Sequence, residues 1–173
     1  MEPKENKNYP ADILALLHTK AETDHFIQQI DSLSESLFSK KTDVKGKMNE
    51  LFSSEMVVTI EHTCRTIGLD ITNIIALQHF LSQLKDVIKK TPNVCVTLAF
   101  KPNQKITQRI YDWLCFRLKQ RVIIDVKVEK HLIGGAIIEF QGKHYEYSLH
   151  IALSEKLLAL SKNDKNVQPI KHN

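Results

Sequence analysis

The spacing of hydrophobic residues divides the chain into two parts. Up to about residue 90, apolar side chains recur every three or four positions, which is the period of one helix face. A helical stretch begins near Pro10, and its stripe continues through Phe26, Ile30, Leu33 and Leu37 to a polar break at residues 39–43. Thr42 or Asp43 is expected to cap the next helix, which the pattern predicts as one element over residues 44–67.

A further helix follows Gly68, which is a typical helix stop. Asp70 or Thr72 is expected to begin it, and its apolar stripe runs to Ile88. Three or four amphipathic helices joined by short connections must bury their stripes against one another. Residues 10–90 therefore predict a helical bundle.

Beyond Pro92 the period changes to two, as in strands. A helical stripe at Ile106, Ile110, Trp113, Leu114 and Leu118 interrupts the strand pattern, and a tight turn is expected at Gln141-Gly142. The expected elements are strand 94–100, helix 106–118, strands 122–128, 132–140 and 144–147, and a last helix beginning at Leu149. The predicted fold class is α+β, with a tail over 1–9, a helical bundle over 10–90, a β-α-β-β-β-α domain over 91–161 and a polar tail over 162–173.

Composition is that of an ordinary globular protein, with 42% apolar and 25% charged residues in 173. No apolar run approaches the roughly 18 residues that span a bilayer, and the opening Met-Glu-Pro-Lys-Glu-Asn-Lys lacks a signal peptide's apolar core. We therefore expect a soluble, intracellular protein.

Charge is distributed unevenly along the chain. Residues 1–90 carry 11 Lys and Arg against 13 Asp and Glu, a net charge of −2, whereas residues 91–173 carry 13 against 7, a net charge of +6. A basic half suits an acidic partner, either protein or nucleic acid, although an ordinary solvated surface has the same composition.

Motifs that carry chemistry are missing from the sequence. It contains no phosphate-binding glycine loop, no Gly-x-Ser-x-Gly elbow, no His-Glu-x-x-His and no Cys-x-x-Cys. Cys95 and Cys115 are expected to be small buried hydrophobes, and His79 to be a histidine on a helix surface. We predict no catalytic residue, no metal site and no cofactor.

Gly134 and Gly135 interrupt an otherwise good strand pattern. Glycine weakens a strand, and in that position it is typical of a bulge, a bend or a close backbone approach. We expect a bend in the sheet at this pair.

The segment around these glycines resembles the carboxy-terminal signature of the delta subunit of F-type ATP synthases, whose mitochondrial form is the oligomycin-sensitivity-conferring protein. The signature has an acidic residue, Leu-Ile-Gly-Gly, an apolar strand, a glycine-containing turn and a Ser-Leu pair that opens a terminal helix. The residues at these positions, which we take as a structural signature, are Glu129, Leu132, Gly134, Gly135, Gly142, Ser148 and Leu149.

This resemblance implies a non-catalytic stator subunit of the peripheral stalk, in an enzyme that makes ATP from proton flow. It implies that the bundle docks on amino-terminal helices of the alpha subunits and that residues 91–161 hold the carboxy-terminal end of the b subunit. The implied location is peripheral, on the cytoplasmic face of the cell membrane, with no direct membrane insertion and no nucleic acid. A helical adaptor protein unrelated to ATP synthase is the alternative, and a nucleic-acid-binding protein is a further one.

Overall fold

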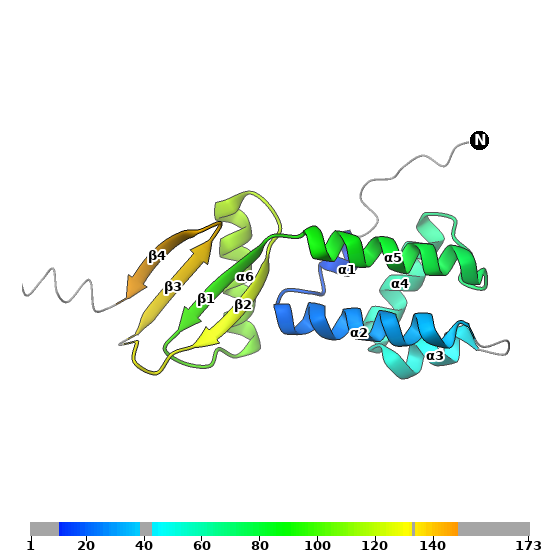
Figure 1. Ribbon diagram of the computed structural model, residues 1–173, viewed down its shortest axis with the longest axis horizontal. Helices are drawn as coiled ribbons and strands as arrows, with labels where there is room; N and C mark the ends of the chain where they lie inside the picture. The colour runs from blue at the N-terminus through cyan, green and yellow to red at the C-terminus, as the bar shows by residue number, and fades with distance from the viewer. Residues whose placement is uncertain (1–10, 39–42, 133, 149–173) are drawn as a thin grey trace, which may run out of the picture. The chain divides into compact units, whose positions relative to one another are not determined.

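The computed structural model describes residues 11–38, 43–132 and 134–148. Five helices precede the first strand, and a four-stranded sheet with one intervening helix follows them (Figure 1). The fold class is α+β, as predicted. The helices and strands are α1 Ala11–Leu14, α2 Lys20–Ser36, α3 Val44–Leu51, α4 Ser54–Thr66, α5 Ile74–Lys90, β1 Asn93–Leu98, α6 Gln104–Leu118, β2 Ile123–Val128, β3 Gly135–Phe140 and β4 Lys143–Ser148.

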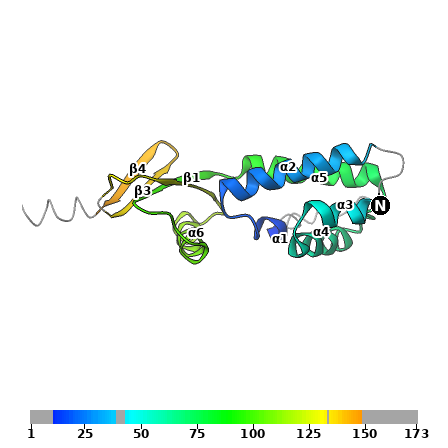
Figure 2. The same ribbon diagram turned by 90° about the horizontal axis from the view of Figure 1, so that it is seen from below.

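The helical core forms where the apolar stripes of α2 and α5 meet. These two long helices lie side by side (Figures 1 and 2), and an ion pair between Lys85 and Asp31 joins them. Phe26 and Phe80 are the largest side chains buried between the helices. A capping box at Thr19 begins α2: its hydroxyl accepts from the Glu22 N–H, and the Glu22 carboxylate accepts from the Thr19 N–H at 3.0 Å.

The prediction of one helix over residues 44–67 is wrong. The chain breaks into α3 and α4 at Phe52, which is extended and buried in the core. The Ser53 hydroxyl accepts a hydrogen bond from the Met56 N–H at 3.3 Å and so begins a new helix. Phe52 packs its ring against Phe26, with 5.6 Å between ring centroids, and this contact requires the chain to turn.

The predicted start of α5 is also wrong. The Asp70 carboxylate accepts from the Thr72 N–H two residues later, at 2.9 Å, which is an Asx-type turn and not a helix cap. The cap is Asn73, whose side-chain oxygen accepts from the Ala76 N–H at 3.2 Å. The helix therefore begins at Ile74, and the predicted three or four helices of this half are five in the described residues.

The sheet has the strand order β2-β1-β3-β4, with β3 antiparallel to both β1 and β4. The four predicted strands and the helix between the first two are all present. One face of β1 and β3, formed by Val94, Val96, Leu98 and Ile138, is buried. The predicted last helix and both predicted tails lie outside the described residues, apart from position 148, which ends β4.

Two details of the second half differ from the prediction. The buried side chains of α6 are Tyr111 and Leu114, whereas Trp113 is exposed, because it lies about 130° around the helix from the middle of the buried face. Cys95 and Cys115 are half-buried and not fully buried. His79 lies on an exposed helix surface, as expected.

Contacts along the chain divide it into two compact units. One comprises the described residues up to Asn93 together with Gln108–Asp125, and the other comprises Val94–Thr107 with the residues from Val126 onward. Most of α6 and the start of β2 therefore belong with the helices by their contacts.

Polar and ring contacts join distant segments of the first unit. The His18 carbonyl accepts from the Ile124 N–H at 2.9 Å, and the Arg121 guanidinium donates to the Ala11 carbonyl at 3.2 Å. The His18 ring lies against that of Tyr111, with 4.4 Å between centroids. Burial, followed by a hydrogen bond with Cys115, raises the pKa of Tyr111 to about 12, so its hydroxyl stays protonated at neutral pH.

Candidate interaction surfaces

The predicted signature residues lie in and next to the β3–β4 hairpin. The two strands pair from Gly135 opposite Ser148 to Phe140 opposite Lys143, and a two-residue turn joins them. Gly142 in that turn lies at the far end of the hairpin from Gly135 and Ser148, about 17 Å away along a six-residue strand. The structure thus brings Gly135 and Ser148 together and separates Gly142 from them.

Gly134 and Gly135 both have φ of +92°, in a region that L-residues rarely adopt. Gly135 begins β3, and Gly134 precedes it. The predicted bend is therefore present, but it lies at the start of the strand and not inside it. A strand over residues 132–140 is wrong for this reason: the backbone at Gly134 does not have the strand conformation.

Glu129 and Leu132 form the turn that leads into these glycines. The Leu132 N–H donates to the Glu129 carbonyl at 3.2 Å, and the Glu129 N–H donates to the Leu98 carbonyl at the end of β1 at 2.9 Å. The Glu129 side chain is exposed and the Leu132 side chain is half-buried. Their backbones fix the connection between β2 and β3. Leu149, the last signature residue, lies outside the described residues.

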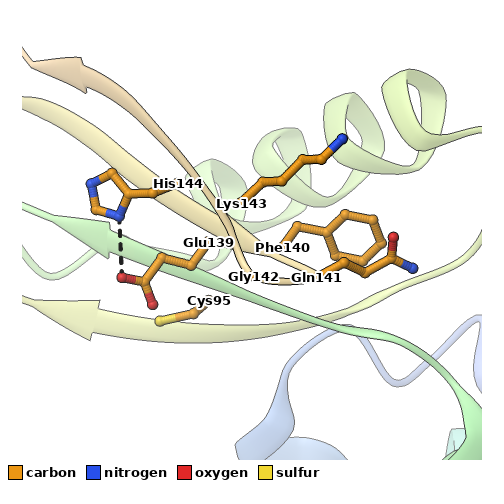
Figure 3. A pocket seen from close by; sticks show the side chains of 7 residues that line it. All are labelled: Cys95, Glu139, Phe140, Gln141, Gly142, Lys143 and His144. Carbon is orange, nitrogen blue, oxygen red and sulfur yellow. Dashed lines mark ion pairs between the residues drawn. The ribbon is translucent and has the colours of Figure 1, made fainter.

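A shallow hollow of about 310 Å³ lies on the hairpin, lined by Cys95, residues 139–142, Lys143 and His144. Cys95 is opposite Glu139, which is opposite His144, so these three side chains occupy one sheet face. Figure 3 shows the Glu139 and His144 side chains pointing toward one another, with 3.3 Å between Oε1 and Nδ1. Both are half exposed, so solvent screening limits this pair to less than about 1 kcal/mol.

Neither this hollow nor a second one has the geometry of a reaction centre. The second, of about 300 Å³, is lined by α4 residues and the loop after them, among them Glu61, Cys64 and Arg65. Burial, with a smaller effect of the Glu61 carboxylate, raises the pKa of the Cys64 thiol to about 11, which disfavours the nucleophilic thiolate. Among the described residues no cluster of three or more His, Cys, Asp or Glu side chains could hold a metal ion.

The described surface instead presents large apolar side chains to solvent. On the helices these include Val58, Ile75, Trp113 and Phe116, and Phe38 lies in the turn after α2. Such residues at the surface are typical of protein contacts when several lie on one helix face. None of the helices in the described part of the chain combines the length and hydropathy needed to cross a bilayer.

The comparison with protein families decides the assignment. The model of the ATP synthase delta (OSCP) subunit matches residues 28–159, which is most of the chain. The chain belongs to this family. Members of the ATP synthase delta (OSCP) family are structural stator subunits and not enzymes, so this chain is a non-catalytic peripheral-stalk subunit of an ATP synthase. The match includes every predicted signature residue.

Other comparisons add little to the family assignment. Among solved structures, the chain is similar to one from the Polytomella F-ATP synthase in primary rotary state 3, at 17% identity with a TM-score of 0.39. The match covers 45% of this chain and 100% of that one. A likeness this distant supports no conclusion about function. No curated protein matches the chain.

The exposed face of α6 is not evident from the predicted apolar stripe. That stripe includes Trp113, which is exposed, and leaves out Phe116, which is exposed as well. Tyr111 was the available signal, because Tyr111, Leu114 and Leu118 form a stripe at three- and four-residue steps that leaves Trp113 on the other side.

Proposed function

We propose that this delta (OSCP) family subunit acts as a stator clamp with two docking regions. Residues 10–90 bind amino-terminal helices of the alpha subunits, and residues 91–161 bind the carboxy-terminal end of the b subunit. The subunit thereby joins the catalytic head to the stalk during proton-driven ATP synthesis. The family match over residues 28–159 carries the proposal, since it extends over both regions.

The packing of the helices suits a part that must resist torque. Side chains with almost no exposure fill the space between α2, α4 and α5, among them Ile30, Ile60 and Leu84. The Gln29 amide donates to the Leu51 carbonyl and the Lys85–Asp31 ion pair joins α2 to α5, so polar contacts also cross between helices. A densely packed core transmits strain with little deformation.

The location follows from the complex and not from any membrane segment of this chain. We propose that the subunit is peripheral, on the cytoplasmic face of the cell membrane, and is held there by its partner subunits. We propose that the subunit neither binds nucleic acid nor inserts directly into the membrane.

The test uses the full chain with each partner segment in turn. We expect an alpha-subunit amino-terminal peptide and a b-subunit carboxy-terminal peptide each to bind at micromolar concentration or below in calorimetry. Since the proposed surfaces differ, saturation with one peptide should change the affinity for the other less than threefold. Failure of both peptides to bind would refute the clamp. Mutual competition would refute the two-region arrangement.

Two results would favour the alternative functions. Binding to DNA or RNA that weakens steeply with salt would support a nucleic-acid-binding protein. Retention of unrelated helical peptides with the same affinity as the ATP synthase segments would support a general adaptor.

A further inference from the structure

Helix α6 presents two aromatic side chains to solvent on one face. Trp113 is 43% exposed and Phe116 is 81% exposed. They are three residues apart, so they are neighbours on the helix surface. Exposing two large rings costs free energy in water, and such a pair at the centre of a surface is typical of a contact anchor.

Basic side chains surround this aromatic pair. Arg109 and Arg117 lie four residues before and after Trp113, and Lys105 lies one turn before Arg109, all three exposed. The acid on this face, Asp112, accepts a hydrogen bond from the Gln108 amide at 2.9 Å. In the described part of the chain, neither arginine forms an ion pair. We define the α6 face as Arg109, Trp113, Phe116 and Arg117. Within the described residues its two cations therefore have no acidic partner.

We propose that the α6 face is a docking surface for an amphipathic helix that has apolar residues at its centre and acidic residues along its edge. The proposal rests on the proposed function, in which the carboxy-terminal end of the b subunit is that helix. The aromatic rings enter the apolar stripe of the partner, and the two arginines pair with its carboxylates. Charge complementarity sets the orientation and raises the association rate.

The dimensions of the α6 face favour a helix over other partners. From Arg109 to Arg117 it is about 12 Å long, or a little over two turns, which matches a helix packed along it at three- and four-residue spacing. Duplex nucleic acid is less suitable because the Asp112 carboxylate on this side of the helix would repel its phosphate backbone. A bilayer surface is less suitable because two rings bury little apolar area.

The chain supplies its own reporter for this contact. Trp113 is the only tryptophan of the 173 residues, so its fluorescence reports the environment of the α6 face directly. A b-subunit carboxy-terminal peptide without tryptophan is titrated into the full chain. We expect a saturable blue shift of the emission as the indole leaves water, and no shift with the alpha-subunit peptide.

Matched variants assign the contact to this face. Phe116→Ala and the double variant Arg109→Glu with Arg117→Glu should each weaken binding of the b-subunit peptide at least tenfold, which corresponds to 1.4 kcal/mol. The controls remove the same chemistry elsewhere: Ile75→Ala on α5, where the side chain is 80% exposed, and Lys89→Glu at the end of α5. Both controls should keep the wild-type affinity. Phe116→Ala and Ile75→Ala should keep the wild-type midpoint of urea unfolding. The variants at Arg117 and Lys89 each reverse a cation in the last turn of a helix, so both should lower the midpoint by a similar small amount.

The outcomes separate this inference from the proposed function. If calorimetry shows that the b-subunit peptide binds the wild type but the emission and the Phe116→Ala affinity do not change, the docking surface lies elsewhere and only the inference fails. If the b-subunit peptide does not bind the wild type, the proposed b-subunit docking region and the inference fail together. A lowered unfolding midpoint for Phe116→Ala means that its ring packs within this chain. A blue shift caused by anionic lipid vesicles or by self-association at higher concentration overturns the inference in favour of those partners.

Discussion

The turn between β3 and β4 allows a test of backbone strain without side-chain clashes. Gln141 and Gly142 have φ of +50° and +74°, the pattern of a type I′ hairpin turn, in which both central residues are left-handed. A Cβ added at Gly142 would meet no atom within 4 Å. The effect of Gly142→Ala therefore comes from the backbone alone.

The expected magnitude follows from two opposing effects. A left-handed conformation costs an L-residue about 1–2 kcal/mol relative to glycine. Alanine also lowers the conformational entropy of the unfolded chain, and this effect stabilises the folded state by about 0.4–1 kcal/mol. We expect Gly142→Ala to lower the free energy of unfolding by about 1 kcal/mol. Gln141→Asn should raise it by about 0.5 kcal/mol, because asparagine adopts this conformation more readily and Asn-Gly is the favoured pair for the turn.

The assay is urea unfolding followed by far-ultraviolet circular dichroism, with hydrogen exchange of the β3 and β4 amides as the local measure. A change of 1 kcal/mol should move the thermal midpoint by about 2–4 °C in a domain of this size. If Gly142→Ala is as stable as the wild type, or if Gln141→Asn destabilises the chain, the assignment of strain to this turn is wrong.

Gly46 gives a matched control with the opposite sign. It lies inside α3 with an ordinary helical backbone, and an added Cβ would come 2.6 Å from the Asp43 carboxylate, the end of an exposed side chain that can rotate away. Gly46→Ala should therefore stabilise the protein by about 0.5–1 kcal/mol through helix propensity. Equal destabilisation by both glycine substitutions would indicate that left-handed backbone is not the cause.

Three further predictions concern the bend, the core and the buried thiol. Gly135→Val should lower the free energy of unfolding by about 1–3 kcal/mol, because a β-branched residue is strained at φ +92°; an unchanged thermal midpoint would contradict this. Phe80→Ala should cost about 3–5 kcal/mol in urea unfolding, since the ring is 2% exposed; a loss below 1 kcal/mol would place the ring outside the core. The pKa of Cys64 is raised from 9.0 to about 11, so its contribution to stability is complete below pH 9 and is lost as pH rises toward 11. At pH 8 a thiol reagent should label the half-buried Cys95 and Cys115 before Cys64, and equal rates for all three would contradict the burial.

Local signals in the sequence determined most of the secondary structure. The change from a three-to-four period to a period of two near Pro92 separates helices from strands because each period reflects one buried face. The sequence predicts the turn at Gln141-Gly142 because glycine is one of the few residues that readily adopt the left-handed backbone of a tight turn. The family signature could also be recognised from the sequence. Its paired glycines, Gly134 and Gly135, serve a local backbone conformation with positive φ, so no distant contact is needed to recognise them.

Tertiary contacts decided the features that these signals left open. The helix break at Phe52 depends on its packing against Phe26, and a continuous apolar stripe does not show which distant ring is its neighbour. The contacts of α6 and β2 with the first helices, such as the His18 ring on Tyr111 and the Ile124 N–H on the His18 carbonyl, join residues about 100 positions apart, and the sequence does not show which distant residues meet.

Tertiary packing also determines the exposure of Trp113. Hydrophobicity identifies side chains that gain free energy on leaving water, but only the folded chain determines which of them become buried. Tyr111 and Leu114 occupy the buried face of α6, and Trp113 therefore lies on the outer face, where we propose that a partner helix docks.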